Sequence, residues 1–125
     1  IEAFQGQQIR FNADFHAFTT REPYGVTGHI VAWNYPLQLL ARGVAPAIAT
    51  CNCSVVKPAD ETPRSSVRLA ELAIETGIPE GVFNVVLGHG PETGAALCGH
   101  AGIRQIGFVG STQIGSVVAM AAAQR

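Results

Sequence analysis

The sequence predicts an α/β fold in which a parallel sheet is covered by helices on both faces. Short apolar runs alternate with segments of helical composition four times between residues 21 and 125. The apolar runs are continuous and do not alternate with polar residues, which is typical of parallel strands buried on both faces. No internal repeat or low-complexity linker interrupts this order. These observations favour one α/β domain or part of one.

The composition of the 125-residue chain limits the kinds of molecule that it is expected to bind. A net charge of −1 and 47% hydrophobic residues argue against a nucleic-acid surface and against disorder. No apolar run approaches the roughly 18 residues of a membrane span, and the first residues lack a signal-peptide pattern. We therefore predict a cytoplasmic protein whose partners are small molecules and protein surfaces, not nucleic acid or membrane. The residues at the two ends, Ile1 and Arg125, suggest a piece of a longer chain.

Cysteine and histidine form no recognisable site in the sequence. Cys51, Cys53 and Cys98 are odd in number and lack a CxxC pair, so neither a disulfide framework nor a zinc site is predicted. We expect all three to be buried as small hydrophobic residues. The four histidines are scattered without metal-ligand spacing, and we assign no metal.

The first twenty residues differ in character from the rest. Residues 9–20 alternate apolar and polar with a period of two, which predicts an exposed strand or hairpin. Its apolar face holds Ile9, Phe11 and Phe15. Because no core of its own lies behind this face, we expect it to need a partner surface.

Four strand–helix pairs follow in chain order. The expected strands cover residues 26–33, 53–57 and 82–87 and a run that ends at Gly110, and the expected helices cover residues 37–49, 63–76 and 91–98 and a segment that begins after Ser111. A proline at its first position and a glycine after its last predict the limits of the second helix. The first helix contains Gly43 and Pro46 in its interior.

The turn from the fourth strand into its helix offers backbone amides to an anion. Gly110 lets a ligand approach the backbone closely, and Gly115 lets the helix pack tightly on its strand. Ser111 or Thr112 can cap the helix, whose N-terminal dipole and unpaired N–H groups favour a phosphate. An ordinary strand–turn–helix with a serine cap explains the same residues.

The ends of the predicted strands gather the chain's unusual polar residues. In parallel sheets ligands bind outside the carboxyl ends of the strands. Lys57, the only lysine, ends the second strand and is followed by Asp60. The two side chains could each hydrogen-bond a ribose hydroxyl. A surface ion pair at the start of a helix is an equal alternative.

Two further strand ends carry candidate ligand-binding residues. Gly88, Gly90 and Gly94 resemble a dinucleotide-binding fingerprint with one extra residue in the last gap, but a glycine-rich loop that needs tight turns has the same pattern. No lysine follows them, which excludes a P-loop. At the end of the first strand, Asn34 could aim its amide N–H at a developing oxyanion. The alternative is an asparagine that caps the helix beginning near Pro36.

Four segments together resemble the aldehyde dehydrogenase superfamily. In family order and spacing they are EPYGVTGHIVAWNYPL from residue 22, KPADETP from residue 57, GIPEGVFNVV from residue 77 and FVGSTQIG from residue 108. The resemblance runs from residue 9 to the end of the chain. It implies a Rossmann-like NAD(P)-binding domain over residues 21–125. Residues 1–20 are then a strand or hairpin from the arm by which subunits pair.

The resemblance also implies an activity. Members of this superfamily oxidise an aldehyde to an acid with NAD(P), through a thiohemiacetal and a thioester on a catalytic cysteine. Asn34 falls on the family's oxyanion asparagine and is the one catalytic residue expected here. The general-base glutamate and the nucleophilic cysteine are expected beyond Arg125, and none of the three cysteines matches the nucleophile's surroundings. The expected assembly of the complete enzyme is a homodimer or homotetramer.

The cofactor contacts that the resemblance implies come from all four strand ends. They are Ile30, Val31, Ala32, Trp33, Lys57, Ala59, Asp60, Gly90, Pro91, Gly94, Ala95, Phe108, Val109, Gly110, Ser111 and Ile114. Lys57 and Asp60 fall on the adenosine-ribose positions, and Gly110 with Ser111 on the pyrophosphate position. Asp60 replaces the family's usual glutamate and Val109 a Thr or Ser. Since an acid disfavours a 2′-phosphate, we expect NAD as cofactor, with NADP as the alternative.

The sequence leaves one different function open. The chain could be a non-catalytic fragment that acts as an oligomerising or nucleotide-binding module. The alternating residues 9–20 and the missing nucleophile favour that alternative.

Overall fold

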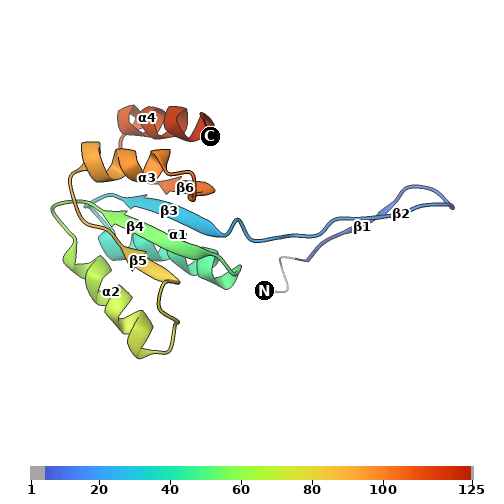
Figure 1. The fold of residues 1–125 in the computed structure, drawn as a ribbon, viewed down its shortest axis with the longest axis horizontal. Helices are drawn as coiled ribbons and strands as arrows, with labels where there is room; N and C mark the ends of the chain where they lie inside the picture. Colours follow the sequence, from blue (N-terminus) through green and yellow to red (C-terminus); the bar gives the residue numbers. More distant parts are fainter. Residues whose placement is uncertain (1–4, 125) are drawn as a thin grey trace.

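The computed structural model describes residues 5–124 and contains the four predicted strand–helix units. β3 (Val26–Val31), β4 (Cys53–Pro58), β5 (Phe83–Val85) and β6 (Gln105–Phe108) form a parallel sheet in the order β5-β4-β3-β6 (Figure 1). If only the four strands of this sheet are numbered in chain order, they appear along the sheet as third, second, first and fourth. The strand order 3-2-1-4-5-6 of doubly wound dinucleotide-binding sheets begins in the same way. The predicted Rossmann-like fold class is confirmed.

The helices cover both faces of the sheet. α1 (Pro36–Ala49) and α2 (Arg64–Glu75) lie on one face, and α3 (Ala95–Gly99) and α4 (Thr112–Ala123) lie on the other (Figure 1). The chain changes face after β5, because β6 pairs with β3 and not with β5. β3 and β6 therefore flank the point where the strand order reverses, which is where open α/β sheets bind ligands.

The main core lies between the sheet and the α1–α2 face. Leu40 and Val44 of α1 pack with Val56 of β4 and Phe83 of β5, and each is at most 7% exposed. Val31 of β3 belongs to the same cluster. Burial of an aliphatic or aromatic side chain of this size contributes about 1.5–3 kcal/mol, so this cluster is a principal source of stability.

The structure explains why α1 contains a glycine, Gly43, in its interior. The ring of His29, in β3, is 6% exposed and lies against the helix at this position. A Cβ on Gly43 would lie 2.6 Å from His29 Nδ1, and one on Gly107 would lie 3.0 Å from the same atom. The helix therefore carries a glycine in its interior because an imidazole occupies the space of the missing side chain.

Several element limits differ from the sequence prediction. β5 is limited to Phe83–Val85, although Val86 N still donates to Val56 O at 2.9 Å. The segment predicted as one helix over residues 91–98 begins as a wider π-helical turn, Gly90–Gly94, and becomes α3 afterwards. α2 begins at Arg64 and ends before Gly77, whose φ of 92° favours glycine.

The three cysteines do not share one environment. Cys98 is buried, as expected, and Cys53 is half-buried. The expectation was wrong for Cys51, which is exposed and has a φ of 62° in the turn that follows α1. This left-handed conformation is uncommon for residues other than glycine, asparagine and aspartate.

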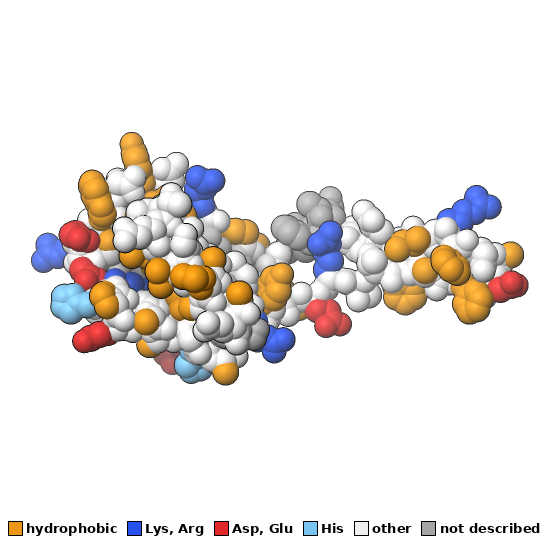
Figure 2. Space-filling view, turned by 90° about the horizontal axis from the view of Figure 1, so that it is seen from above, with side chains coloured by type: hydrophobic (Ala, Val, Ile, Leu, Met, Phe, Trp, Pro, Cys, Tyr) orange, Lys and Arg blue, Asp and Glu red, His pale blue; other side chains and the backbone are white. Residues whose placement is uncertain are grey.

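The N-terminal segment forms the predicted hairpin. β1 (Gln8–Arg10) and β2 (His16–Phe18) pair antiparallel and project away from the α/β unit (Figure 1). The rings of Phe11 and Phe15 pack edge to face with centroids 6.4 Å apart. Both rings stay more than 60% exposed, as does Phe18, and Figure 2 shows hydrophobic side chains on this arm. Residues 1–4 of the predicted arm lie outside the described residues.

Within residues 5–124 none of the helices combines the length and the apolar character that a membrane span requires.

Candidate cofactor site

A cavity of about 660 Å³ opens at the carboxyl ends of β3 and β4, between α3 and α4. Its lining is mostly apolar and consists of Ile30, Lys57, Gly90, Pro91, Gly94, Ala95, Cys98, Gly99, Ile114, Val117, Val118, Ala121 and Gln124. The volume lies within the range of small-molecule and cofactor sites, about 300–1,000 Å³. The predicted ligand edge of the sheet therefore does carry a hollow of suitable size.

Lys57 supplies the charge of this cavity. Its side chain is only 5% exposed, and Nζ lies 2.6 Å from Oδ1 of Asp60. The alternative of a surface ion pair does not describe this geometry, because the lysine is buried. A buried ammonium requires a charge partner, and Asp60 provides it.

Asp60 has a second partner that sequence analysis did not identify. His89 Nδ1 lies 3.0 Å from Asp60 Oδ2, so the two carboxylate oxygens contact different side chains. The hydrogen bond from Lys57 lowers the pKa of the Asp60 carboxyl below its usual value, and the contact with His89 adds to this. Asp60 is therefore ionised at neutral pH.

The turn from β6 into α4 has the predicted cap. Ser111 Oγ accepts a hydrogen bond from Ile114 N at 3.4 Å, and no acidic residue lies in the first turn of α4. A Cβ on Gly110 would lie 2.5 Å from the ring of Phe108, and one on Gly115 would lie 3.3 Å from it. Both glycines thus also make room for this ring, a reason that their spacing did not reveal.

The glycine-rich loop divides into two kinds of position. Gly88 has a φ of 139°, and a Cβ there would lie 2.1 Å from Thr93 Oγ1, so the turn itself requires glycine. A Cβ on Gly90 or Gly94 would meet no atom within 4 Å. Both residues line the cavity. The tight-turn alternative therefore accounts for Gly88 and leaves the other two available to a ligand.

The residues at the end of β3 and just after it lie in different environments. Val31 is buried in the core on the α1 face, whereas Ile30 lines the cavity on the opposite face. Trp33 and Asn34 are exposed beyond the end of the strand. Asn34 is not the cap of α1, because Tyr35 holds that position without a side-chain cap bond. Within residues 5–124 the Asn34 amide has no hydrogen-bond partner.

The structure brings seven of the predicted contacts into one cavity. They are Ile30, Lys57, Gly90, Pro91, Gly94, Ala95 and Ile114. The other predicted contacts do not line it, although Asp60 reaches it through Lys57. The later turns of α4 add lining residues that were not predicted from the sequence, notably Val117, Val118 and Ala121. Their helical spacing signals a buried face but does not say whether protein or ligand covers it.

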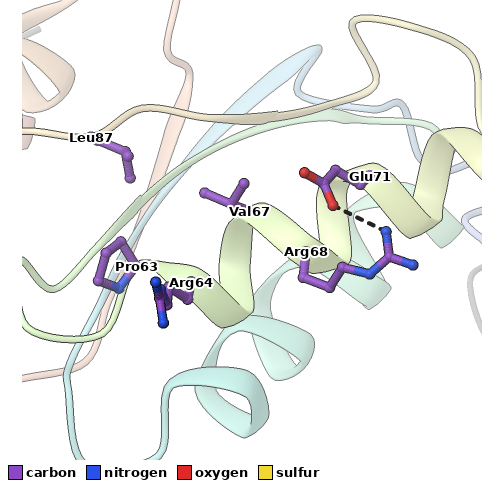
Figure 3. Close-up of a pocket in the computed structure, with 6 residues that line it drawn as sticks. All are labelled: Pro63, Arg64, Val67, Arg68, Glu71 and Leu87. Atoms are coloured by element: carbon purple, nitrogen blue, oxygen red, sulfur yellow. Dashed lines mark hydrogen bonds and ion pairs between the residues drawn. The ribbon is translucent and has the colours of Figure 1, made fainter.

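A second hollow, of about 320 Å³, lies beside the first turns of α2 and is lined by Pro63, Arg64, Val67, Arg68, Glu71 and Leu87 (Figure 3). Arg68 Nη1 lies 3.0 Å from Glu71 Oε2 and 2.8 Å from Glu75 Oε1. These carboxylates raise the pKa of Arg68. The guanidinium is thus engaged by its own helix, and the hollow gains no ligand-binding group from it.

Fold and site together define a dinucleotide-binding type of α/β protein. The sequence model described as the aldehyde dehydrogenase family matches residues 1–125. The chain therefore belongs to the aldehyde dehydrogenase family. This confirms the resemblance seen in the four sequence segments.

Individual relatives agree with this membership. Hydroxyisobutyraldehyde dehydrogenase of Mycolicibacterium austroafricanum is 51% identical over 114 residues, which cover 91% of this chain and 23% of the relative. An NADP-dependent enzyme of E. coli superimposes with a TM-score of 0.94 at 39% identity, covering 98% of this chain and 26% of that one. The NAD+ complex of an aldehyde dehydrogenase from Bacillus cereus gives 0.91 at 41% identity, covering 95% and 24%. The chain spans about a quarter of the length of these relatives.

Proposed function

We propose that this chain is the cofactor-binding part of an NAD(P)-dependent aldehyde dehydrogenase that oxidises an aldehyde to a carboxylic acid. The observation that carries the proposal is the cavity between α3 and α4, which has the buried Lys57 at one side and the first turn of α4 at another. Solved relatives that contain NAD+ or depend on NADP support a nicotinamide dinucleotide as the ligand.

The adenosine half of the dinucleotide fits the cavity chemically. Its apolar walls on α3 and α4 suit an adenine ring, with Ile114 on one side. Lys57 can donate to a ribose hydroxyl, and Asp60 can accept from one. Because Asp60 is ionised, it repels a 2′-phosphate, and NAD is the proposed cofactor with NADP as the alternative.

The start of α4 is the proposed contact for the pyrophosphate. The first turn of this 12-residue helix presents backbone N–H groups beside the Ser111 cap. No acidic side chain in that turn competes with a phosphate. The helix dipole favours an anion there by about 0.3–1 kcal/mol.

Asn34 is the proposed catalytic residue of this segment. When bound, the nicotinamide ring supplies the acceptor for the hydride. The Asn34 amide is exposed at the ligand edge of the sheet and has no partner among the described residues, so it can donate to the oxygen of the aldehyde adduct. Cys51 and Cys53 lie at the amino end of β4, on the sheet edge opposite to the cavity. They are therefore unsuited to be the nucleophile.

The binding proposal can be tested by titrating the chain with NAD+ and NADP+ and measuring heat and Trp33 fluorescence. Ala95 and Ala96 form a matched pair, since both are exposed on α3 but only Ala95 lines the cavity. Ala95→Leu should abolish saturation by millimolar NAD+, and Ala96→Leu should leave it unchanged. A chain that is folded by circular dichroism but binds neither dinucleotide would contradict the proposal.

The role of Asn34 requires an active enzyme that contains this segment. There, Asn34→Ala should reduce kcat by about 10²–10³ with little change in the Kd of NAD+, because the donor acts on the transition state. Unchanged turnover would remove Asn34 from the mechanism.

The hairpin supports a second proposal, which concerns assembly. Ile9, Phe11 and Phe18 are 48–72% exposed on an arm that projects from the α/β unit. We propose that this arm pairs subunits into a homodimer or homotetramer. Light scattering should give the mass of a multimer for the wild-type chain. The double variant Phe11→Ser, Phe18→Ser should have the mass of a monomer. A monomeric wild-type chain that binds NAD+ would contradict the pairing proposal alone.

A further inference from the structure

His89 lies at the junction of the ligand loop and the charged pair. Its Nδ1 lies 3.0 Å from Asp60 Oδ2, while Lys57 Nζ lies 2.6 Å from Asp60 Oδ1. The His89 side chain is 81% exposed and the Lys57 side chain only 5%. The carboxylate is therefore held between a buried cation and an exposed imidazole.

Backbone hydrogen bonds hold the main chain of His89 in the loop. The His89 carbonyl oxygen accepts hydrogen bonds from Glu92 N at 3.1 Å and from Thr93 N at 2.8 Å. His89 directly precedes the Gly90–Gly94 turn, whose Gly90 and Pro91 line the cavity. A ligand in the cavity that reaches Lys57 and Asp60 would thus come near His89 as well.

We propose that His89 is a specificity-determining residue that sets, through its protonation, how well the site accepts a phosphate on the 2′ carbon of the adenosine ribose. This inference rests on the proposed binding of a dinucleotide. With a neutral imidazole, Lys57 and Asp60 compensate each other. With a protonated imidazole the group of three carries a net positive charge, which attracts a phosphate and offsets the repulsion from Asp60.

His89 has charged neighbours on two segments of the chain. Asp60 faces it from the segment after β4, with Lys57 behind that carboxylate. Glu92 lies on its own turn, and Glu61 follows Asp60. Histidine is the side chain type that changes charge between about pH 5 and 8. Acceptance of the 2′-phosphate should therefore increase as the pH falls through this range.

The test compares two ligands that differ only in that phosphate. AMP and adenosine 2′,5′-bisphosphate are titrated into the chain by calorimetry from pH 5.5 to 8.5. The Kd ratio of AMP to the bisphosphate should increase as the pH falls from 8.5 to 5.5. This increase should be about fivefold larger in wild type than in His89→Gln, as expected for an exposed charge pair. Phosphate groups themselves titrate near pH 6, and His89→Gln subtracts this contribution. The exposed His16 on the remote hairpin is the control, and His16→Gln should behave as wild type.

A fixed charge provides an independent arm. His89→Lys should keep the acid-side ratio at pH 8.5, since an ammonium stays protonated there. Circular dichroism verifies the fold of each variant. Identical pH profiles in wild type and His89→Gln, with both ligands bound, would overturn the role of His89 and leave the cofactor site intact. Failure of AMP, the bisphosphate and NAD+ to bind at any pH would overturn the proposed function and this inference with it.

Discussion

Gly43→Ala should destabilise the protein, although alanine is the better helix former. Gly43 lies inside α1, where an alanine normally gains about 1 kcal/mol over glycine. Here the new Cβ would lie 2.6 Å from Nδ1 of His29. The ring cannot withdraw easily, because Nε2 lies 2.9 Å from Thr27 Oγ1 and Gly107 closes the space from β6.

The magnitude follows from two opposing contributions. Overpacking a buried site costs about 1–3 kcal/mol, and the gain in helix propensity offsets about 1 kcal/mol of it. We expect Gly43→Ala to lower the free energy of unfolding by about 1 kcal/mol and by at most about 2 kcal/mol. For a chain of this size, about 1 kcal/mol corresponds to a decrease of roughly 4 °C in Tm.

Urea and thermal unfolding of a double-mutant cycle check the physical cause. In a His29→Ala background the imidazole is gone, so Gly43→Ala should change sign and stabilise by about 1 kcal/mol. A similar loss of stability in both backgrounds would refute the contact with His29 as the cause. A gain of stability in the wild-type background would refute the steric argument altogether.

Three further substitutions and conditions have expected outcomes. Cys51→Gly should raise the urea midpoint by the equivalent of about 0.5–1 kcal/mol, because it relieves a φ of 62° at an exposed turn, and Cys53→Gly in the adjoining strand should lower it. Burial lowers the pKa of His29, so the unfolded state binds its proton first as the pH falls. Stability from this group is complete above about pH 6.5 and declines below it by at most about 1.4 kcal/mol per pH unit, a slope that His29→Gln should remove from urea unfolding curves. Ser66 Oγ is buried without a hydrogen-bond partner among the described residues, so Ser66→Ala should leave the free energy of unfolding unchanged or raise it. A decrease of more than about 1 kcal/mol in that free energy would contradict this prediction, because it would mean that the hydroxyl makes a hydrogen bond.

The sequence predicted the parts of this fold that depend on local periodicity. The four strands and their helices were found because each apolar run and each helical segment is complete within a short stretch of chain. The limits of β5 and of the Gly90–Gly94 turn were not predicted, because they depend on how the chain leaves the sheet beside β4. Periodicity carries no information on such tertiary contacts.

The candidate site was predictable to the extent that its residues are close in sequence. Lys57 and Asp60 are three residues apart, so the sequence placed both at the same strand end and offered an ion pair between them as one of two interpretations. The contact of His89 with Asp60 joins residues 29 positions apart and exists because β5 lies beside β4. No feature of the sequence around His89 signals a charge partner.

The side chains of β3 point alternately to the cavity on one face of the sheet and to the core on the other. Alternate residues of a strand point to opposite faces. Gly28 and Ile30 face the α3–α4 side, where a Cβ on Gly28 would lie 3.3 Å from Leu97 and Ile30 lines the cavity. His29 and Val31 face α1, where the ring of His29 lies against Gly43 and Val31 packs into the core. Substitutions at His29 should therefore change stability without changing the cavity, whereas larger residues at Ile30 should reduce ligand binding while the α1–α2 core stays intact.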